Sequence, residues 1–172
     1  MDLDQQIQLL IENAPQDGTT PEVVKAIAPA LKALAEQLQN SQYYILQTND
    51  EQWVSTVLRS LEQPEVEKQV LYAYPTARDA AQQSQTASGM TTVAVPLPIT
   101  HILFQALAIQ PLDSIVFLEV PGSVESGVEV KREEIQGLVQ AYLQRYQENQ
   151  VNASKNSARV SPSTSQIPPD IA

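Results

Sequence analysis

The sequence predicts an α+β fold, in which about five helices pack around one small, mostly antiparallel four-stranded sheet. Several segments repeat apolar residues at three- and four-residue spacing, the period of an amphipathic helix. Other segments are short, rich in β-branched and aromatic residues, and bounded by turn residues, as strands are. Hydrophobic residues make up 42% of the chain, which is enough for one packed core.

Two helices are predicted at the start of the chain. Residues 2–14 place their apolar side chains on one face, and Asp2 is positioned to cap the first turn. Residues 19–40 continue the pattern, with Pro21 in the first turn, where its missing amide hydrogen costs nothing. Because an interior proline removes a hydrogen bond and clashes with the preceding turn, we expect a kink or break at Pro29.

The middle of the chain has the pattern of strands. Residues 43–48 and 53–59 are β-branched and aromatic and are separated by four polar residues, which predicts a hairpin. A third strand is predicted over residues 68–74, and a short helix follows over residues 76–81.

The last elements alternate between extended and helical patterns. Residues 92–95 are apolar but bounded by prolines, so we expect an extended approach to a helix over residues 99–108. Residues 114–120 (SIVFLEV) predict the fourth strand, buried on both faces for much of its length. A final helix is predicted over residues 130–147.

The chain divides into a domain and a tail. Residues 1–148 are predicted to form a single acidic α+β domain. Residues 149–172 are rich in Ser, Asn and Pro and lack apolar periodicity, so burial cannot offset the entropy of ordering them. We therefore expect a disordered C-terminal tail. An open alternative is that its ending, IPPDIA, is a short docking element, because consecutive prolines favour an extended conformation.

Composition excludes several classes of partner. The formal net charge of −10 repels phosphate backbones and acidic membrane surfaces, which predicts no binding to nucleic acid or membranes. No apolar run approaches the length of a membrane span. The absence of cysteine and the acidic, polar N-terminal segment, which is unlike a secretory signal, predict a cytoplasmic protein.

The sequence predicts no enzyme, no cofactor and no metal site. His101 lies among apolar residues without a serine, cysteine or second histidine motif, which favours a structural role. Glu129, Glu133 and Glu134 match no calcium-loop spacing and suit an exposed helix start. A hydrolase using other carboxylates remains a minor alternative.

Some apolar and aromatic residues are candidates for protein binding. Tyr43 and Tyr44 are consecutive in a predicted strand, so their side chains point to opposite faces and one of them must leave the core side. The helix near residues 99–109 is apolar nearly all round, and a small domain rarely buries every side of such a helix. The predicted binding residues are Tyr43, Tyr44, Trp53, Ile99, Leu103, Phe104 and Leu107.

Several stretches of the chain resemble the CcmS-like carboxysome shell-assembly chaperones, a group of small acidic cyanobacterial proteins: DLDQQIQLLIENAPQDGTTPEVVKAIAPALK, YYILQT with WVSTVL, VLYAYPTARDAA, and IPPDIA. The resemblance lies in overall pattern and element order over most of the domain. It implies a non-enzymatic, homodimeric protein of carbon fixation that binds the C-terminal extension of a hexameric shell protein. A looser similarity relates FLEVPGSVESGVEVKREEIQGLV to SseB-type domains and implies no activity.

The predicted function is that of an assembly chaperone or adaptor that binds a terminal peptide segment of a partner protein, with the carboxysome shell protein peptide as the suspected partner. Apolar and aromatic side chains would anchor the peptide, and the acidic rim would steer it. The alternative is a structural or assembly factor for a photosynthetic complex, which would use a flat protein interface instead of a groove.

Overall fold

The computed structural model describes residues 2–86, 91–109, 111–123 and 125–160. The helices in this part are α1 (Leu3–Asn13), α2 (Thr20–Ala35), α3 (Ala77–Thr86), α4 (Ile99–Ala106) and α5 (Arg132–Val160). The strands are β1 (Gln42–Thr48), β2 (Thr56–Arg59), β3 (Glu67–Ala73), β4 (Thr92–Pro98), β5 (Ser114–Leu118) and β6 (Gly127–Lys131). The predicted α+β class is confirmed.

The strands form two sheets, so the prediction of one mostly antiparallel four-stranded sheet is wrong. One sheet has the order β2-β3-β5-β6, with β3 and β5 parallel and the outer pairs antiparallel. The other is the antiparallel pair β1-β4. The parallel pair arises because α3, β4 and α4 lie between β3 and β5 in the chain, and such a crossover returns the chain in the same direction.

The expected hairpin of residues 43–48 and 53–59 forms only at its turn. The Thr48 amide donates to the Gln52 carbonyl oxygen at 2.8 Å, and the Val54 amide donates to the Leu46 carbonyl oxygen at 2.9 Å. After this turn the chain leaves β1 and enters β2, which pairs with β3 in the other sheet. β4, which includes the expected extended approach to the helix at residue 99, takes the place beside β1.

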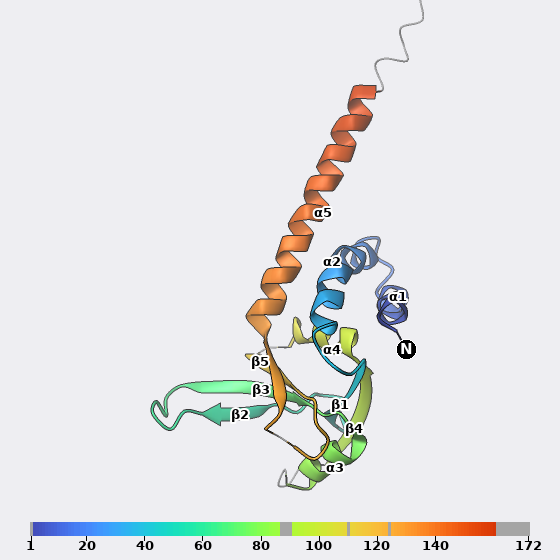
Figure 1. Ribbon diagram of the computed structural model, residues 1–172. Helices are drawn as coiled ribbons and strands as arrows, with labels where there is room; N and C mark the ends of the chain where they lie inside the picture. Colours follow the sequence, from blue (N-terminus) through green and yellow to red (C-terminus); the bar gives the residue numbers. More distant parts are fainter. Residues whose placement is uncertain (1, 87–90, 110, 124, 161–172) are drawn as a thin grey trace, which may run out of the picture.

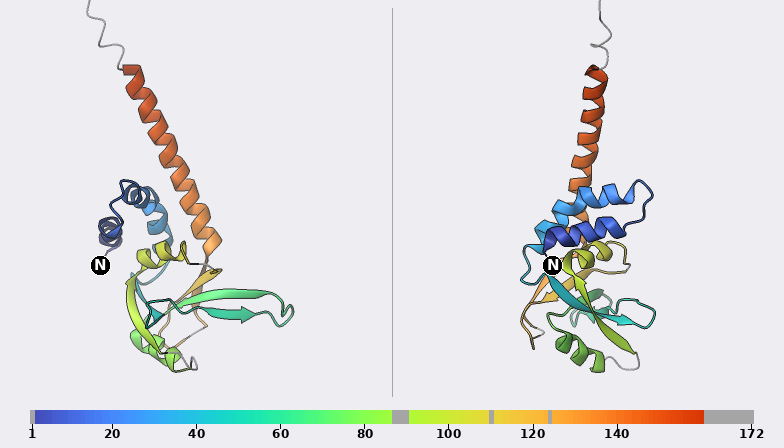
Figure 2. Two further views of the ribbon diagram at one scale, coloured as in Figure 1. Left: turned by 180° about the vertical axis from the view of Figure 1, so that it is seen from behind. Right: turned by 90° about the vertical axis from the view of Figure 1, so that its right-hand side faces the viewer.

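The elements pack in layers around the larger core. Helices α1, α2 and α4 lie together on one side of the strands, and α3 lies on the opposite side, next to β4 (Figure 1, Figure 2). The larger core joins these helices to the inner sides of β1, β3 and β5. A smaller cluster, built around Leu46, Tyr74, Ala80 and Leu118, lies between β1, α3 and the opposite side of the four-stranded sheet.

The starts of the first two helices differ in how they are capped. Asp2 accepts a hydrogen bond from the Gln5 amide at 2.8 Å, which confirms the predicted cap of α1. At α2 the Asp17 carboxylate accepts from the amides of Thr19 and Thr20, and these bonds lower the pKa of Asp17 to about 2. The helix continues through Pro29 to Ala35.

Helix α5 is longer than predicted. It has 29 residues, corresponding to about 44 Å, and its C-terminal part extends away from the body (Figure 1). Residues 149–160, which the sequence placed in the disordered tail, are helical, and residues 161–172 lie outside the described part. No proline or glycine lies between Gly137 and Pro162, so nothing in this stretch interrupts the helix before Val160.

Candidate protein-binding site

Three of the predicted binding residues lie in the core. The side chains of Tyr43, Ile99 and Leu103 are 0% exposed. Much of the apolar helix α4 is covered, because α1 and α2 pack against it and another side faces the strands. In this structure these three side chains stabilise the fold and offer no surface to a partner.

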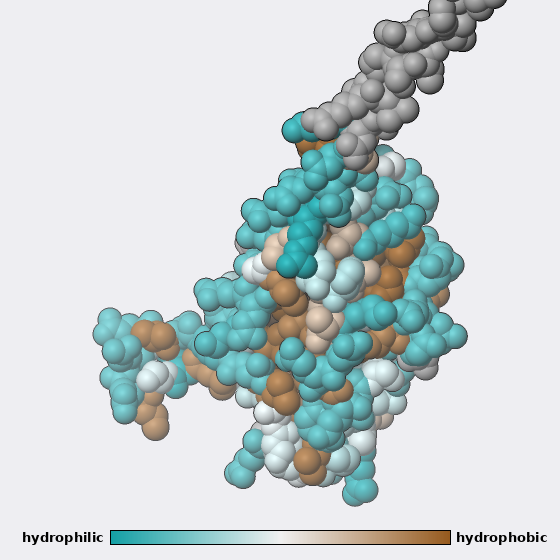
Figure 3. Space-filling view, turned by 45° about the horizontal axis from the view of Figure 1, so that its top comes forward, coloured by the Kyte–Doolittle hydropathy of each residue, from teal (hydrophilic) through white to brown (hydrophobic). Residues whose placement is uncertain are grey.

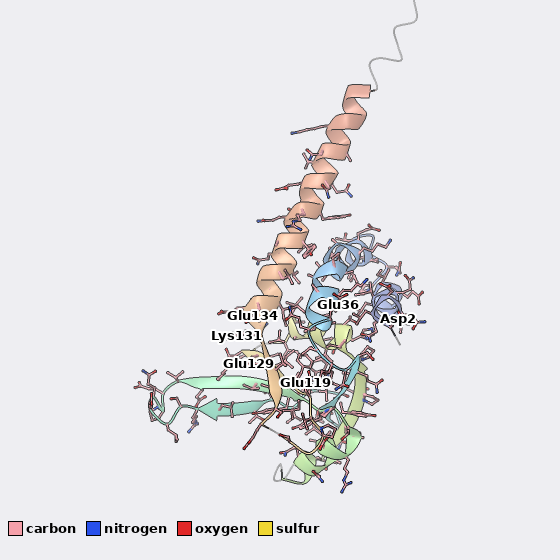
Figure 4. All side chains as sticks on the ribbon, viewed as in Figure 1. Asp2, Glu36, Glu119, Glu129, Lys131 and Glu134 are labelled. Carbon is pink, nitrogen blue, oxygen red and sulfur yellow. The ribbon has the colours of Figure 1, made fainter. Side chains whose placement is uncertain are left out.

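Tyr43 joins the two sheets. Its ring meets Phe117 of β5 edge to face, with the ring centroids 5.0 Å apart and an interplanar angle of 64°. Its hydroxyl donates a hydrogen bond to the Glu119 carboxylate at 2.9 Å, and Glu119 lies within the body of the molecule (Figure 4). Burial, together with this bond to Glu119, raises the pKa of Tyr43 well above its usual value near 10.

A second polar contact fixes α1 to α4. Gln6, itself buried, accepts hydrogen bonds through Oε1 from the Thr100 amide at 3.1 Å and from the Thr100 hydroxyl at 2.9 Å. Its Nε2 donates to the Ser41 carbonyl oxygen at 2.9 Å. His101 Nε2 lies 3.3 Å from the Gln6 carbonyl oxygen, and burial lowers the pKa of His101. This environment gives the histidine a structural contact in the core.

Three predicted residues are half-buried. Tyr44 packs against the smaller core cluster, while Phe104 and Leu107 pack against the larger one. The end of α4 is held by Arg132, whose guanidinium donates to the carbonyl oxygens of Ala106 at 3.2 Å and Leu107 at 2.7 Å. These bonds satisfy carbonyl groups that the end of a helix leaves without partners.

Trp53 is the predicted residue that lies in a surface hollow. The hollow has a volume of about 660 Å³ and is open to solvent on one side. The tight turn after β1 supplies one wall, and the end of α4 with the segment that follows supplies the other. It is lined by Glu51, Gln52, Trp53, Ser55, Gln69, Gln105, Ala108, Ile109 and Pro111. The turn needs one unusual backbone conformation, because Glu51 has a φ of 61°.

Beside this hollow, the β2–β3 hairpin projects from the body and exposes apolar side chains (Figure 1, Figure 3). The exposed fraction is 46% for Val57, 42% for Leu58, 53% for Val66 and 100% for Leu61. All of β2 is exposed, and it lies at one end of the four-stranded sheet. Within the described part of the chain, no strand pairs with its outer edge. We call β2 with Leu61 and Val66 the hairpin surface.

The hairpin surface begins next to the Trp53 hollow, because Ser55 lines the hollow and directly precedes β2. Val57 is the register partner of Gln69, and partners in an antiparallel pair point to the same face of the sheet. Because Gln69 lines the hollow, Val57 lies on the hollow's side of the sheet. Leu58, the next residue, lies on the opposite side. An extended chain along β2 would therefore meet an apolar residue on each face.

The charge near this site is mostly negative. Between Asp50 and Lys68 the sequence has five carboxylates against two cations. Both cations are occupied: Arg59 pairs with Glu67 at 2.9 Å, and Lys68 pairs with Glu129, whose pKa this contact lowers (Figure 4). Among the described residues, the exposed Glu62 and Glu65 at the hairpin turn form no ion pair.

Sequence reasoning missed the hairpin surface. It placed residues 53–59 in a hairpin with residues 43–48 and gave Leu61 and Val66 no role. The sequence feature that could have indicated this surface is Leu61, an isolated leucine between Ser60 and Glu62 in a polar turn. A large apolar side chain at such a position has nothing to pack against.

The rest of the described chain contains a second hollow but no metal site. The described residues contain no group of three or more His, Cys, Asp or Glu side chains arranged to hold a metal ion. In the same part of the chain, no helix is both long and apolar enough to cross a membrane. A second hollow, lined among others by Asp113, Lys131 and Arg132, is surrounded by charged groups at the start of α5.

Comparisons with known proteins give no relative for this chain: no protein-family model, no curated protein and no solved structure matches it.

Proposed function

We propose that this protein is a non-enzymatic assembly chaperone or adaptor that binds a terminal peptide segment of a partner protein. The observation that supports this most is the exposed apolar hairpin surface beside the Trp53 hollow. Monomeric soluble proteins keep contiguous exposed apolar surface small, and an apolar patch with a polar rim is typical of an interaction site. Trp53 is well suited to the anchoring role, because aromatic side chains in partly enclosed sites contribute much of the energy of many interfaces.

The shape of the site favours a peptide over a folded domain. The hollow lies between a tight turn and a helix end, and Ser55 in its lining directly precedes the exposed strand β2. An extended peptide can insert one side chain into such a hollow while its backbone follows the strand. The resemblance to CcmS-like chaperones makes the C-terminal extension of a carboxysome shell protein the first candidate partner, and a homodimer in the cytoplasm is part of the same proposal.

A binding assay with a synthetic shell-protein C-terminal peptide tests this proposal. Calorimetric titration of the full chain is expected to show saturable binding. Trp53→Ala should weaken that binding about tenfold or more, because the side chain supplies much of the anchor. Tyr146→Ala is the matched control, since it removes a half-buried aromatic on α5, away from the hollow.

The contrary outcome separates the two predicted modes of binding. If every isolated terminal peptide fails to bind while the protein still associates with an intact photosynthetic complex, the peptide-binding proposal is wrong and the alternative of a flat protein interface is favoured. If the Trp53→Ala protein folds normally and keeps the full affinity, Trp53 is not the anchor.

A further inference from the structure

Within the described residues, no strand is paired with the outer edge of β2. Alternate residues of an edge strand turn their amide and carbonyl groups away from the neighbouring strand, where they can pair with another chain. β2 has β3 on one side and no strand of the described chain on the other. Its four residues, Thr56 to Arg59, are all exposed, so an incoming strand would not have to displace any side chain that covers them.

The side chains around this edge indicate what the incoming strand would contain. Val57 and Leu58 point to opposite faces, so apolar residues of an added strand would have an apolar neighbour on either face. At the turn of the hairpin, Glu62 and Glu65 are exposed without ion pairs among the described residues. These carboxylates would attract lysine or arginine side chains and repel acidic ones.

Charge also argues against a second copy of this chain as the occupant. Pairing two β2 edges would bring together two hairpins that each have an excess of carboxylates, in chains of formal net charge −10. Natural proteins use charged residues and very short strands at sheet edges to prevent such self-pairing. Here the edge strand β2 has only four residues, and the turn of its hairpin contains Glu62 and Glu65. These features disfavour pairing between two copies of β2, whereas a cationic strand would be attracted.

We propose that β2 binds an extended cationic peptide as an additional strand of the four-stranded sheet, with apolar peptide side chains beside Val57 and Leu58 and lysine or arginine side chains near Glu62 and Glu65. This mode rests on the proposed peptide-binding function and specifies how the peptide binds. Backbone hydrogen bonds supply affinity, and the alternate side chains supply selectivity. The neighbouring Trp53 hollow takes a side chain from the same face as Val57.

The probe for this proposal is the peptide Lys-Lys-Val-Val-Thr-Val-Val-Lys-Lys, which has apolar residues on both faces of an extended strand, added to the full chain. Amide hydrogen exchange is expected to slow within residues 56–59, because an added strand engages the amides of the alternate residues that face the outer edge. The same peptide N-methylated at its five central residues should lose binding about tenfold or more, since it cannot form the ladder. The peptide with glutamate in place of every lysine should also lose binding.

A pair of charge variants tests the acidic contribution. The double variant Glu62→Lys with Glu65→Lys should weaken binding of the lysine peptide about tenfold. The control is the double variant Glu12→Lys with Glu148→Lys, which makes the same change in net charge at exposed positions on α1 and α5. The control should keep the peptide affinity within about twofold of the unchanged protein. Equal binding by the two double variants, equal binding of the N-methylated peptide, or no protection of residues 56–59 would overturn the proposal.

The peptide experiments distinguish strand addition at β2 from the proposed binding of a partner peptide. If the shell-protein peptide binds but protects residues other than 56–59, strand addition at β2 is wrong and peptide binding stands. If the lysine peptide protects residues 56–59 while no partner peptide binds, the β2 site stands and the proposed function fails.

Discussion

Tyr43 on β1 donates its hydroxyl hydrogen bond to the carboxylate of Glu119, 76 positions later in the chain, at 2.9 Å. The same carboxylate accepts a hydrogen bond from the Gln39 amide at 3.2 Å. Glu119 directly follows β5, so this bond ties the two-stranded sheet to the four-stranded one. A tyrosine whose strand position suggested a binding surface is therefore part of the junction between the sheets.

Tyr43→Phe should lower the free energy of unfolding by about 1.5 kcal/mol, because it removes a hydrogen bond to a charged acceptor while keeping the ring on Phe117. Urea denaturation measures this change. Tyr44→Phe is the control, since no hydrogen bond of its hydroxyl is described, and it should change stability by less than about 0.5 kcal/mol. Equal effects of the two variants would show that the Glu119 bond contributes nothing.

The buried phenols should also make stability depend on alkaline pH. Burial raises the pKa of Tyr74 from 10.0 to about 12, and the pKa of Tyr43 is raised as well. Because the folded protein keeps these protons when the unfolded chain has lost them, their contribution is complete below about pH 10 and falls as pH rises through the folded values. The absorbance of tyrosinate should show that two of the tyrosines lose their protons only at a pH well above the usual tyrosine pKa. Simultaneous titration of all six near pH 10 would refute this.

Gln6→Ala should destabilise the fold by about 3 kcal/mol. The change leaves the Thr100 hydroxyl and amide and the Ser41 carbonyl oxygen without the partners they have inside the protein. Thermal unfolding measures the loss. Gln8→Ala is the matched control, because Gln8 is exposed on the same helix and contacts only Glu12 in the described hydrogen bonds. A Gln6 variant as stable as the Gln8 variant would argue against this network.

Arg132→Met should affect both stability and the candidate site. It keeps most of the side-chain stem but removes the two hydrogen bonds to the carbonyl oxygens of Ala106 and Leu107, at a cost of about 2 kcal/mol. The residues that follow α4 line the Trp53 hollow, so peptide affinity should fall in the variant that still folds. Arg145→Met, on the exposed part of α5, removes a cation–π contact with Tyr142 and should lower stability by less than about 1 kcal/mol while leaving peptide affinity unchanged.

The helices were predictable because each depends on local signals. The cap at Asp2 and the apolar stripes act within a few residues of one another. The C-terminal end of α5 was not predicted, because residues 149–160 lack apolar periodicity even though no proline or glycine interrupts them. Strand pairing depends on distant partners. Nothing near residues 92–98 shows that β4 pairs with β1, and nothing near residues 56–59 shows that β2 joins β3. β6 escaped prediction because it is only five residues long and two of them are charged.

The candidate site was predictable only at Trp53. The burial of Ile99 and Leu103 depends on how α1 and α2 fold over α4, which no pattern within α4 reveals. Conversely, the exposure of Val57 and Leu58 follows from the position of β2 at the edge of its sheet. Periodicity identifies which residues are apolar, whereas topology determines which of them are covered.

Trp53 is the single tryptophan of the chain, so its fluorescence reports directly on the hollow. The decisive measurement is a titration of the full protein with the tryptophan-free C-terminal peptide of a carboxysome shell protein, following Trp53 emission and, in parallel, the heat of binding. The proposed function predicts that both signals saturate at the same peptide concentration, with an emission shift as the peptide covers the ring. Saturable heat without any change in emission, or no binding by either signal, would contradict it.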